Sequence, residues 1–288
     1  MSVEATRVNQ DCPSCGAQRP HAFLYEKNHC RIWKCGVCGI GRTETQDFDP
    51  ATYYTKDYFD GALSDGYADY VGAEPVLRRE FADTVAFVRS KVKGGRLLDV
   101  GCAYGFFLQE AKPYFEVAGI EVAQDAVDNC RANGLRVLNG VADQENLRQL
   151  GMMDVIVLLD VIEHVPDPFE TLALCAAQLN PGGVLLLTTG DFASAAARLA
   201  SRNWRLMTPP QHLWFFTPDS MRRLADRTGL RFDGLDHPWK VVPLSLILFQ
   251  LKRMAGMTPS KSTAASRIGV PVNLFDAMRV VMRKPDTA

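Results

Sequence analysis

The feature that most constrains this chain is a series of short apolar runs that alternate with helical patterns from about Glu80 onward. The runs LLDV, DVIVLLD and VLLLTT are almost continuously hydrophobic, which is typical of parallel strands covered on both faces. Alternating strands and helices predict right-handed crossover connections. The pattern therefore favours an α/β fold with a doubly wound, mostly parallel sheet, with strands at residues 96–100, 117–122, 135–138, 155–160 and 184–189.

The last third of the chain continues this pattern. A helix is expected over residues 219–227, because Thr217-Pro218 is a start signal and Gly229 a stop signal. A further helix is expected over 244–254, and the run DAMRVVMRK predicts a closing strand.

A glycine-containing turn, DVGCAYG at residues 99–105, follows the first expected strand. In open α/β sheets, ligands bind at the carboxyl ends of the strands, where glycine lets the backbone approach them. Glu121 ends the next strand, and a carboxylate there can accept hydrogen bonds from both ribose hydroxyls. The spacing alone also fits a dinucleotide site or a closely packed turn.

The sequence of this turn resembles the first motif of class I, Rossmann-like S-adenosylmethionine-dependent methyltransferases, usually written DxGxGxG. The resemblance continues through Glu121, DVIVLLDVIEHVPDP and LNPGGVLLLTT, and covers about residues 95–232. It departs at Ala103, where the middle glycine often stands. The residues that the resemblance assigns to S-adenosylmethionine are Asp99, Gly101, Ala103, Gly105, Glu121, Val122, Asp143 and Asp160.

Within this set, the resemblance implies that the two glycines approach the methionine part of the cofactor. It also implies that Glu121 holds the ribose and that Val122 lies beside the adenine. Asp143 could reach the adenine region, although capping of a helix is an equal interpretation.

Polar residues follow the fourth expected strand in the run Asp160-Val161-Ile162-Glu163-His164. This run resembles the E-x-x-E-H segment of ubiquinone-type O-methyltransferases, which can hold a divalent metal such as magnesium. Metal-independent relatives share the EHV run, and we favour a catalytic or structural role of His164 without a metal. Glu163 is predicted to face the substrate.

A second histidine stands in the run TPPQHLWFF. The run is similar to the H-L-x-x-F segments of small-molecule and sugar C-methyltransferases, in which the histidine faces the acceptor. We therefore predict that His212 is the general base, with a core or helix-start histidine as the alternative. Its aromatic neighbours would desolvate the ring and keep it neutral near pH 7.

Two cysteine pairs, Cys12-x-x-Cys15 and Cys35-x-x-Cys38, are separated by nineteen residues. Each CxxC turn can direct two sulfurs at one metal, so the spacing predicts a four-thiolate zinc site. A closed thiolate shell leaves no position for a substrate, and the zinc is therefore expected to be structural. Buried thiols without metal and redox pairs are the alternatives.

Aromatic and acidic residues join this module to the α/β pattern. Tyr54, Tyr58 and Tyr70 are predicted to cover the acceptor as part of a lid, and a packed linker is the equal alternative. The expected parts are a zinc-binding module over 1–46, an aromatic linker or lid over 47–78 and a methyltransferase domain over 79–288.

Composition narrows the function classes. A net charge of −1, from 32 basic and 33 acidic residues, argues against a protein that neutralises a long phosphate backbone. The start MSVEATRVNQ lacks a secretory pattern, and no apolar run is long enough to span a bilayer, so a cytoplasmic protein is expected.

The leading hypothesis is methyl transfer to carbon or oxygen of a small molecule or of a nucleotide- or lipid-linked glycan precursor. One alternative is an RNA base methyltransferase that contacts RNA through the zinc module. The other is a non-catalytic protein that binds the cofactor. The basic residues after 252, next to the apolar run VVPLSLILFQL, could lie near a lipid-linked acceptor, although core packing of that helix is favoured. The sequence does not determine the oligomeric state.

Overall fold

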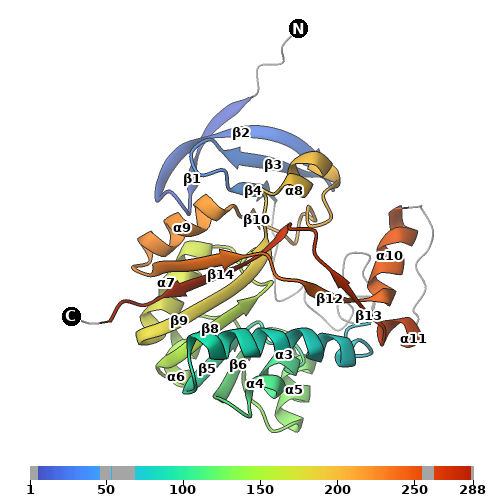
Figure 1. The fold of residues 1–288 in the computed structure, drawn as a ribbon. Coiled ribbons are helices and arrows are strands. Elements are labelled where there is room, and N and C mark those ends of the chain that lie inside the picture. Colours follow the sequence, from blue (N-terminus) through green and yellow to red (C-terminus); the bar gives the residue numbers. More distant parts are fainter. Residues whose placement is uncertain (1–5, 46–52, 54–68, 255–262, 287–288) are drawn as a thin grey trace. The chain divides into compact units, whose positions relative to one another are not determined.

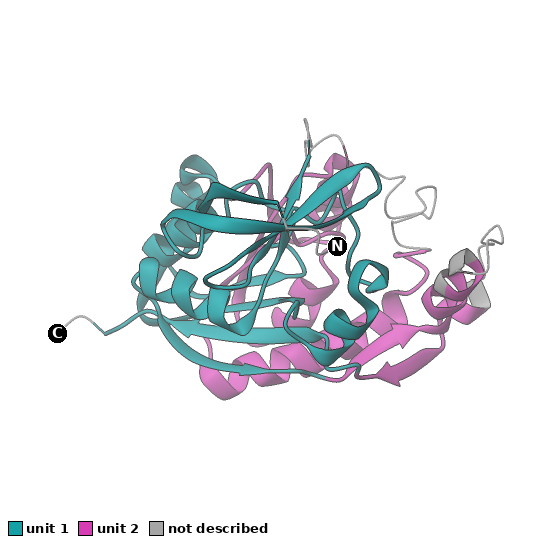
Figure 2. Cartoon of the chain, turned by 90° about the horizontal axis from the view of Figure 1, so that it is seen from above, with its two compact units in different colours: residues 1–50, 142–238, 274–288 teal, residues 51–141, 239–273 magenta. Residues whose placement is uncertain are grey.

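The structure is a computed structural model that describes residues 6–45, 53, 69–254 and 263–286 (Figure 1). The chain forms two compact units (Figure 2). Unit 1 comprises residues 1–50, 142–238 and 274–288, and unit 2 comprises residues 51–141 and 239–273. None of the described helices is long and apolar enough to cross a membrane.

A mostly parallel seven-stranded sheet, in the order β11-β14-β9-β8-β5-β6-β7, confirms the predicted α/β fold. β14 is antiparallel to both β9 and β11, whereas β8 and β9 are parallel, as are β5, β6 and β7. The bounds are β5 Arg96–Val100, β6 Glu116–Glu121, β7 Arg136–Asn139, β8 Met153–Leu159, β9 Leu179–Gly190, β11 Arg231–Asp236 and β14 Ala277–Arg283.

Unit 2 contains β5, β6 and β7 with their connecting helices. Leu97 and Leu98 of β5 are fully buried, as expected of consecutive apolar residues in a strand that is covered on both faces. The unit also contains a two-stranded antiparallel sheet of β12 and β13. The remaining elements are α3 Glu74–Lys91, α4 Phe106–Ala111, α5 Gln124–Ala132, β12 Lys240–Pro243, α10 Leu244–Met254, α11 Thr263–Ser266 and β13 Gly269–Val272.

Unit 1 contains the other four strands of the large sheet, and side-chain caps start its helices. Asp167 caps α7, and Thr217 forms a capping box with Ser220 at the start of α9, where Pro218 takes the first helical position. The helices are α6 Gln144–Leu150, α7 Pro168–Gln178, α8 Ala195–Ala200, the 3₁₀ turn η1 Ser201–Asn203 and α9 Pro218–Arg227.

The N-terminal part of unit 1 is an antiparallel sheet, in the order β1-β2-β3-β4-β10. Its first four strands, β1 Arg7–Cys12, β2 Ala17–Lys27, β3 Cys30–Cys35 and β4 Gly41–Glu44, carry the predicted cysteines and are called the cysteine module below. The fifth strand, β10 Trp214–Phe215, comes from residues far along the chain and pairs with β4. The module is thus built into unit 1 by a shared sheet.

Candidate functional site

The predicted cofactor turn in unit 2 has a left-handed backbone at three positions, with φ of 73° at Gly101, 45° at Ala103 and 77° at Gly105. A Cβ atom at Gly105 would lie 2.6 Å from a methyl carbon of Leu135 and 2.8 Å from Cys130 Sγ, so only glycine fits there. Ala103 keeps the left-handed conformation although an L-residue adopts it rarely. The backbone of the turn is therefore left-handed even at Ala103, the one position that departs from the motif.

Glu121 holds this turn from the end of β6. Its Oε2 accepts a hydrogen bond from the amide of Ala103 at 2.8 Å, and its Oε1 accepts from the amides of Val122 and Ala123 at 2.8 and 2.9 Å. Burial raises the pKa of Glu121, while these three amides act in the opposite direction. A carboxylate has about four acceptor positions, so Oε2 keeps capacity for a ligand hydroxyl.

Asp99, the first residue of the motif, lies beneath the turn and is 2% exposed. Burial raises its pKa well above the usual range, and the charge of nearby Glu121 raises it further. Both carboxyl groups therefore have raised pKa values in one buried region, and Asp99 is the more strongly affected.

The other predicted cofactor residues differ in their surroundings. Val122 is partly exposed at the end of β6. Asp143, in unit 1, accepts a hydrogen bond from the amide of Asn146 at 2.8 Å and caps α6, as the alternative interpretation expected. Its predicted contact with adenine stays a prediction.

Tyr70 is 6% exposed and packs in a cluster with Tyr104 and Phe106. The rings of Tyr70 and Phe106 are stacked, with their centroids 5.5 Å apart. The role of Tyr70 in a lid over the acceptor stays a prediction, as does the alternative of a packed linker. Tyr54 and Tyr58, the other two residues predicted for the lid, lie outside the described residues.

Asp160, which was predicted to bind the cofactor, lies in unit 1 directly after β8. Asp160 has a positive φ of 56°, and its amide donates to the Thr188 hydroxyl at 3.0 Å, while the hydroxyl donates to Asp160 Oδ1 at 2.9 Å. This two-way contact holds a strained residue at the carboxyl end of a parallel strand, where ligands of open sheets bind.

His164 and His212 lie side by side although they are far apart in the sequence. Their ring centroids are 4.7 Å apart and the rings meet edge to face. His164 Nδ1 lies 2.9 Å from the carbonyl oxygen of Gln211. Because a carbonyl only accepts, Nδ1 carries the hydrogen and Nε2 is the acceptor nitrogen of neutral His164.

Burial lowers the pKa of His164 to about 4. It also lowers the pKa of His212 well below its usual value, and neighbouring His164 lowers it further. The backbone of Leu206 acts on the pKa of His212 in the opposite direction. Both imidazoles are therefore neutral at pH 7, as a general base requires.

Glu163 lies beside the two histidines and is 4% exposed. One potential ligand atom from each of Glu163, His164 and His212 lies within 4.8 Å of the others. The magnesium ligands considered from sequence were Asp160, Glu163 and His164, whereas the structure groups Glu163 with two imidazoles. Magnesium prefers oxygen ligands, so this donor set fits it poorly.

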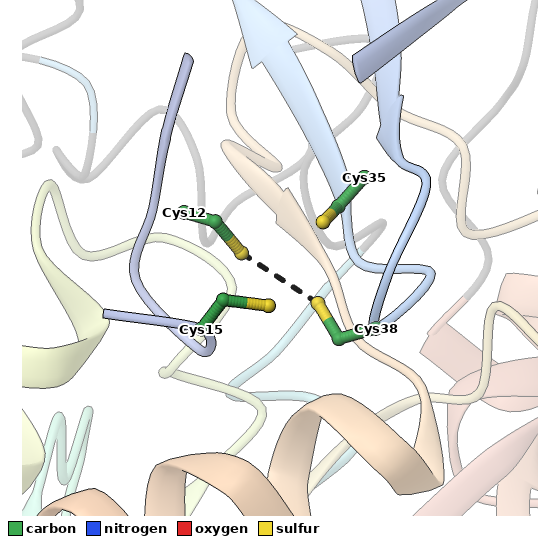
Figure 3. Close-up of side chains that lie close together, drawn as sticks. All are labelled: Cys12, Cys15, Cys35 and Cys38. Carbon is green, nitrogen blue, oxygen red and sulfur yellow. Dashed lines mark hydrogen bonds between the residues drawn. The ribbon is translucent and has the colours of Figure 1, made fainter. Parts of the chain in front are cut away.

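The four predicted zinc ligands also come together, and Figure 3 shows their sulfurs converging from two turns. The sulfurs of Cys12, Cys15, Cys35 and Cys38 lie within 4.8 Å of one another, and those of Cys12 and Cys38 are 3.6 Å apart. Sulfurs bound to one tetrahedral zinc at about 2.3 Å would be about 3.8 Å apart. The arrangement therefore fits a four-thiolate zinc site.

The comparisons with known proteins agree with this geometry. The profile of the family described as "Methyltransferase domain" matches residues 74–233, from the start of α3 into β11. The chain belongs to this methyltransferase family. It is an S-adenosylmethionine-dependent enzyme, and the predicted fold, cofactor and reaction type are confirmed.

Relatives of this methyltransferase include a ubiquinone biosynthesis O-methyltransferase of Xanthomonas euvesicatoria pv. vesicatoria (strain 85-10). It is 33% identical over 181 residues, which cover 57% of this chain and 74% of that protein. The protein of the same name from Methylococcus capsulatus (strain ATCC 33009 / NCIMB 11132 / Bath) is 29% identical over 185 residues, with coverage of 60% and 76%.

Solved structures similar to this methyltransferase include an S-adenosylmethionine-dependent methyltransferase from Archaeoglobus fulgidus. Its TM-score is 0.53 at 17% identity, with 81% of this chain and 100% of that chain covered. Magnesium protoporphyrin IX methyltransferase from Synechocystis PCC 6803, solved with bound S-adenosylhomocysteine, has a TM-score of 0.52 at 13% identity, with coverage of 81% and 97%. At these identities the likeness shows the fold.

Sequence reasoning missed the backbone partners of His212. The carbonyl oxygen of His212 accepts the hydroxyl of Thr43 at 2.6 Å, and that of Gln211 accepts from His164. Thr43 carries no local signal of such a role, because its partner lies 169 residues away. The two-residue length of β10 likewise gives no periodicity to detect.

Proposed function

We propose that this methyltransferase transfers the methyl group of S-adenosylmethionine to a hydroxyl oxygen of a small-molecule acceptor, with His212 as the general base. The pairing of two neutral histidines, His164 after β8 and His212 before β10, carries the proposal. The name of the relatives, O-methyltransferases of ubiquinone biosynthesis, favours oxygen over carbon as the methylated atom.

The reaction needs little from the protein besides positioning and removal of a proton. When bound, S-adenosylmethionine would supply a methyl group on a positively charged sulfur, and S-adenosylhomocysteine would be the leaving group once the methyl group is transferred. The hydroxyl proton of the acceptor passes to an imidazole nitrogen of His212, and the electron pair of the O–H bond stays on oxygen, which forms the new bond to the methyl carbon. The family cofactor supplies the methyl group, and the cofactor turn with Glu121 would hold it.

The low pKa of His212 restricts the acceptor. A weak base removes a proton more readily from an acidic hydroxyl, such as a phenol with a pKa of about 10, than from an aliphatic alcohol. A phenolic or enolic hydroxyl is therefore the acceptor that fits the proposed general base best. Glu163, buried against both histidines, would accept a second hydroxyl or hold the imidazolium that forms.

We also propose that the cysteine module binds one structural zinc ion. The sulfur spacing supports this, and four thiolates would complete the coordination shell without an open position. No step of the methyl transfer is assigned to zinc.

The test uses tritiated S-adenosylmethionine and three probes: 3,4-dihydroxybenzoate, a nucleoside diphosphate sugar and total RNA. We expect label in the catechol, with mass fragmentation locating the methyl on oxygen, and no change when a chelator of magnesium is present. Label in RNA or on a carbon atom would contradict the proposed acceptor. Activity that depends on added magnesium would contradict the proposal that His212 removes the proton without the help of a metal ion.

A further inference from the structure

We infer that Thr43, in the last strand of the cysteine module, is a positioning residue for His212. The inference rests on the proposed function, since it assigns to the module the task of holding the proposed base in place. All residues concerned belong to unit 1.

On the module side, two hydrogen bonds hold the segment that carries His212. The Thr43 hydroxyl donates to the carbonyl oxygen of His212 at 2.6 Å, and the Thr43 amide donates to the carbonyl oxygen of Leu213 at 2.9 Å. Thr43 is 4% exposed, so water competes little for these bonds. One residue of the module thus fixes two consecutive peptide groups.

On the opposite side, the same segment is held by the end of β8. The carbonyl oxygen of Glu163 accepts from the amides of Leu213 and Trp214 at 2.8 and 3.2 Å, and His164 Nδ1 donates to Gln211. The segment 211–214 therefore lies between the cysteine module and His164. A shift on the module side changes the angle at which the two imidazoles meet.

The close approach of the two strands leaves little freedom for such a shift. β4 pairs with β10 through Gly41 opposite Phe215, and a Cβ atom at Gly41 would lie 2.9 Å from the ring of Phe192 and 3.0 Å from Phe215 Cβ. Ile32 of β3 is fully buried in a cluster with Phe192 and Phe215. The module and the segment around β10 thus share one core.

A second anchor connects the proposed zinc ligands to the same region. The Thr217 hydroxyl at the start of α9 donates to the carbonyl oxygen of Cys38 at 2.8 Å, and Arg227 near the end of α9 bonds the carbonyl oxygen of Pro13. Cys38 precedes Thr43 by five residues. Helix α9 thus anchors both cysteine turns of the module to unit 1.

The experiment compares Thr43→Val, which removes the hydroxyl at nearly constant volume, with Thr43→Ser, which keeps it. Thr171→Val is the matched control, because it removes a hydroxyl that donates to the Asp167 carbonyl on α7. Each full-length protein is assayed for zinc content, affinity for S-adenosylhomocysteine, and kcat and KM with 3,4-dihydroxybenzoate. The histidine ring resonances are recorded after labelling of the five histidines, and His212→Gln assigns one of them.

We expect Thr43→Val to shift the His212 resonance and to lower kcat about ten- to hundredfold, because misplacement by about 1 Å can reduce a rate by that order. Zinc content and cofactor affinity should stay as in the unaltered protein. Thr43→Ser should restore kcat and the resonance, and Thr171→Val should change neither.

Two results would overturn the inference. One is an unchanged His212 resonance in Thr43→Val, whatever happens to activity. The other is a shifted resonance with full turnover while His212→Gln is inactive. If Thr43→Val shifts the resonance and His212→Gln keeps full activity, the proposed base is wrong and the positioning by Thr43 stands.

Discussion

At the scale of single residues, the proposed chemistry depends on the tautomer of His164 and on the burial of both imidazoles. His164 donates its Nδ1–H to the carbonyl oxygen of Gln211, so it presents Nε2 as an acceptor toward its surroundings. Burial removes the competing charged form of each ring. The two imidazoles are thus prepared to take a proton before the acceptor binds.

His212→Ala should lower kcat about a hundredfold or more and leave the affinity for S-adenosylmethionine unchanged, because general-base catalysis contributes about 10²–10⁴. Steady-state rates with the catechol probe and calorimetric titration with cofactor measure the two quantities. His29→Ala, at an exposed histidine of the cysteine module, is the control. Full turnover of His212→Ala would exclude the residue from proton transfer.

Glu121→Gln should weaken binding of S-adenosylmethionine tenfold or more. The substitution converts a charged acceptor of three amide hydrogen bonds into an amide that both donates and accepts, and a charge-assisted bond is worth about 1.5–3 kcal/mol. Calorimetry gives the affinity, and thermal unfolding detects any loss of the turn itself. Glu116→Gln, at the exposed start of β6, serves as the control. Equal affinities would mean that Glu121 organises the turn without contacting the cofactor.

At the scale of the elements, the sequence was most informative where an element buries its own apolar residues. The expected strand at 96–100 coincides with β5, and the expected helix at 244–254 coincides with α10. The preference for core packing of α10 holds only in part, because Leu248 and Leu251 are exposed. β10 and the β12–β13 pair were not predicted, since short strands depend on distant partners rather than on a local pattern.

The candidate site also contains parts that the sequence predicts and parts that it does not. The cofactor turn was predictable because its glycines and Glu121 form a local sequence motif, whereas the left-handed conformation of Ala103 was not predicted. The contact between His164 and His212 was not predictable, because it depends on how the segment before β10 folds back onto the end of β8. The sequence therefore indicated each histidine separately without indicating the pair.

The start of α9 offers a test at this scale. Thr217→Val removes an N-cap hydroxyl that bonds Ser220 and the Cys38 carbonyl, so the free energy of unfolding should fall by about 1–2 kcal/mol. Urea denaturation measures the change, and Thr217→Ser should recover most of it. Thr228→Val, at the other end of the same helix, controls for the loss of any hydroxyl. A Thr217→Val protein as stable as the parent would show that the cap contributes nothing.

At the scale of the whole molecule, the cysteine module joins unit 1 by a strand pair and a common core. We predict about one zinc per chain in freshly purified protein and its release in Cys35→Ser, because a three-thiolate remnant binds zinc far more weakly. Elemental analysis and thermal unfolding follow the metal and the stability. Cys30→Ser, in the same module but outside the four-cysteine cluster, should retain zinc. Protein that carries no zinc before any treatment would contradict the site.

The buried histidines also make the stability of the folded protein depend on pH. Unfolded His164 binds a proton near pH 6.5, whereas burial lowers its folded pKa to about 4, so the unfolded state binds more protons between these values. Stability should therefore fall as the pH is lowered from 6.5 to 4, by up to about 3 kcal/mol from this residue. Because carboxylates also titrate in this range, the informative quantity is the difference in slope between the parent and His164→Gln. Urea denaturation at half-unit steps of pH measures it, and His29→Gln, at an exposed histidine, should reproduce the parent slope. Identical slopes in His164→Gln and the parent would mean that His164 is not held neutral by burial, and the proposed proton transfer beside it would lose its electrostatic basis.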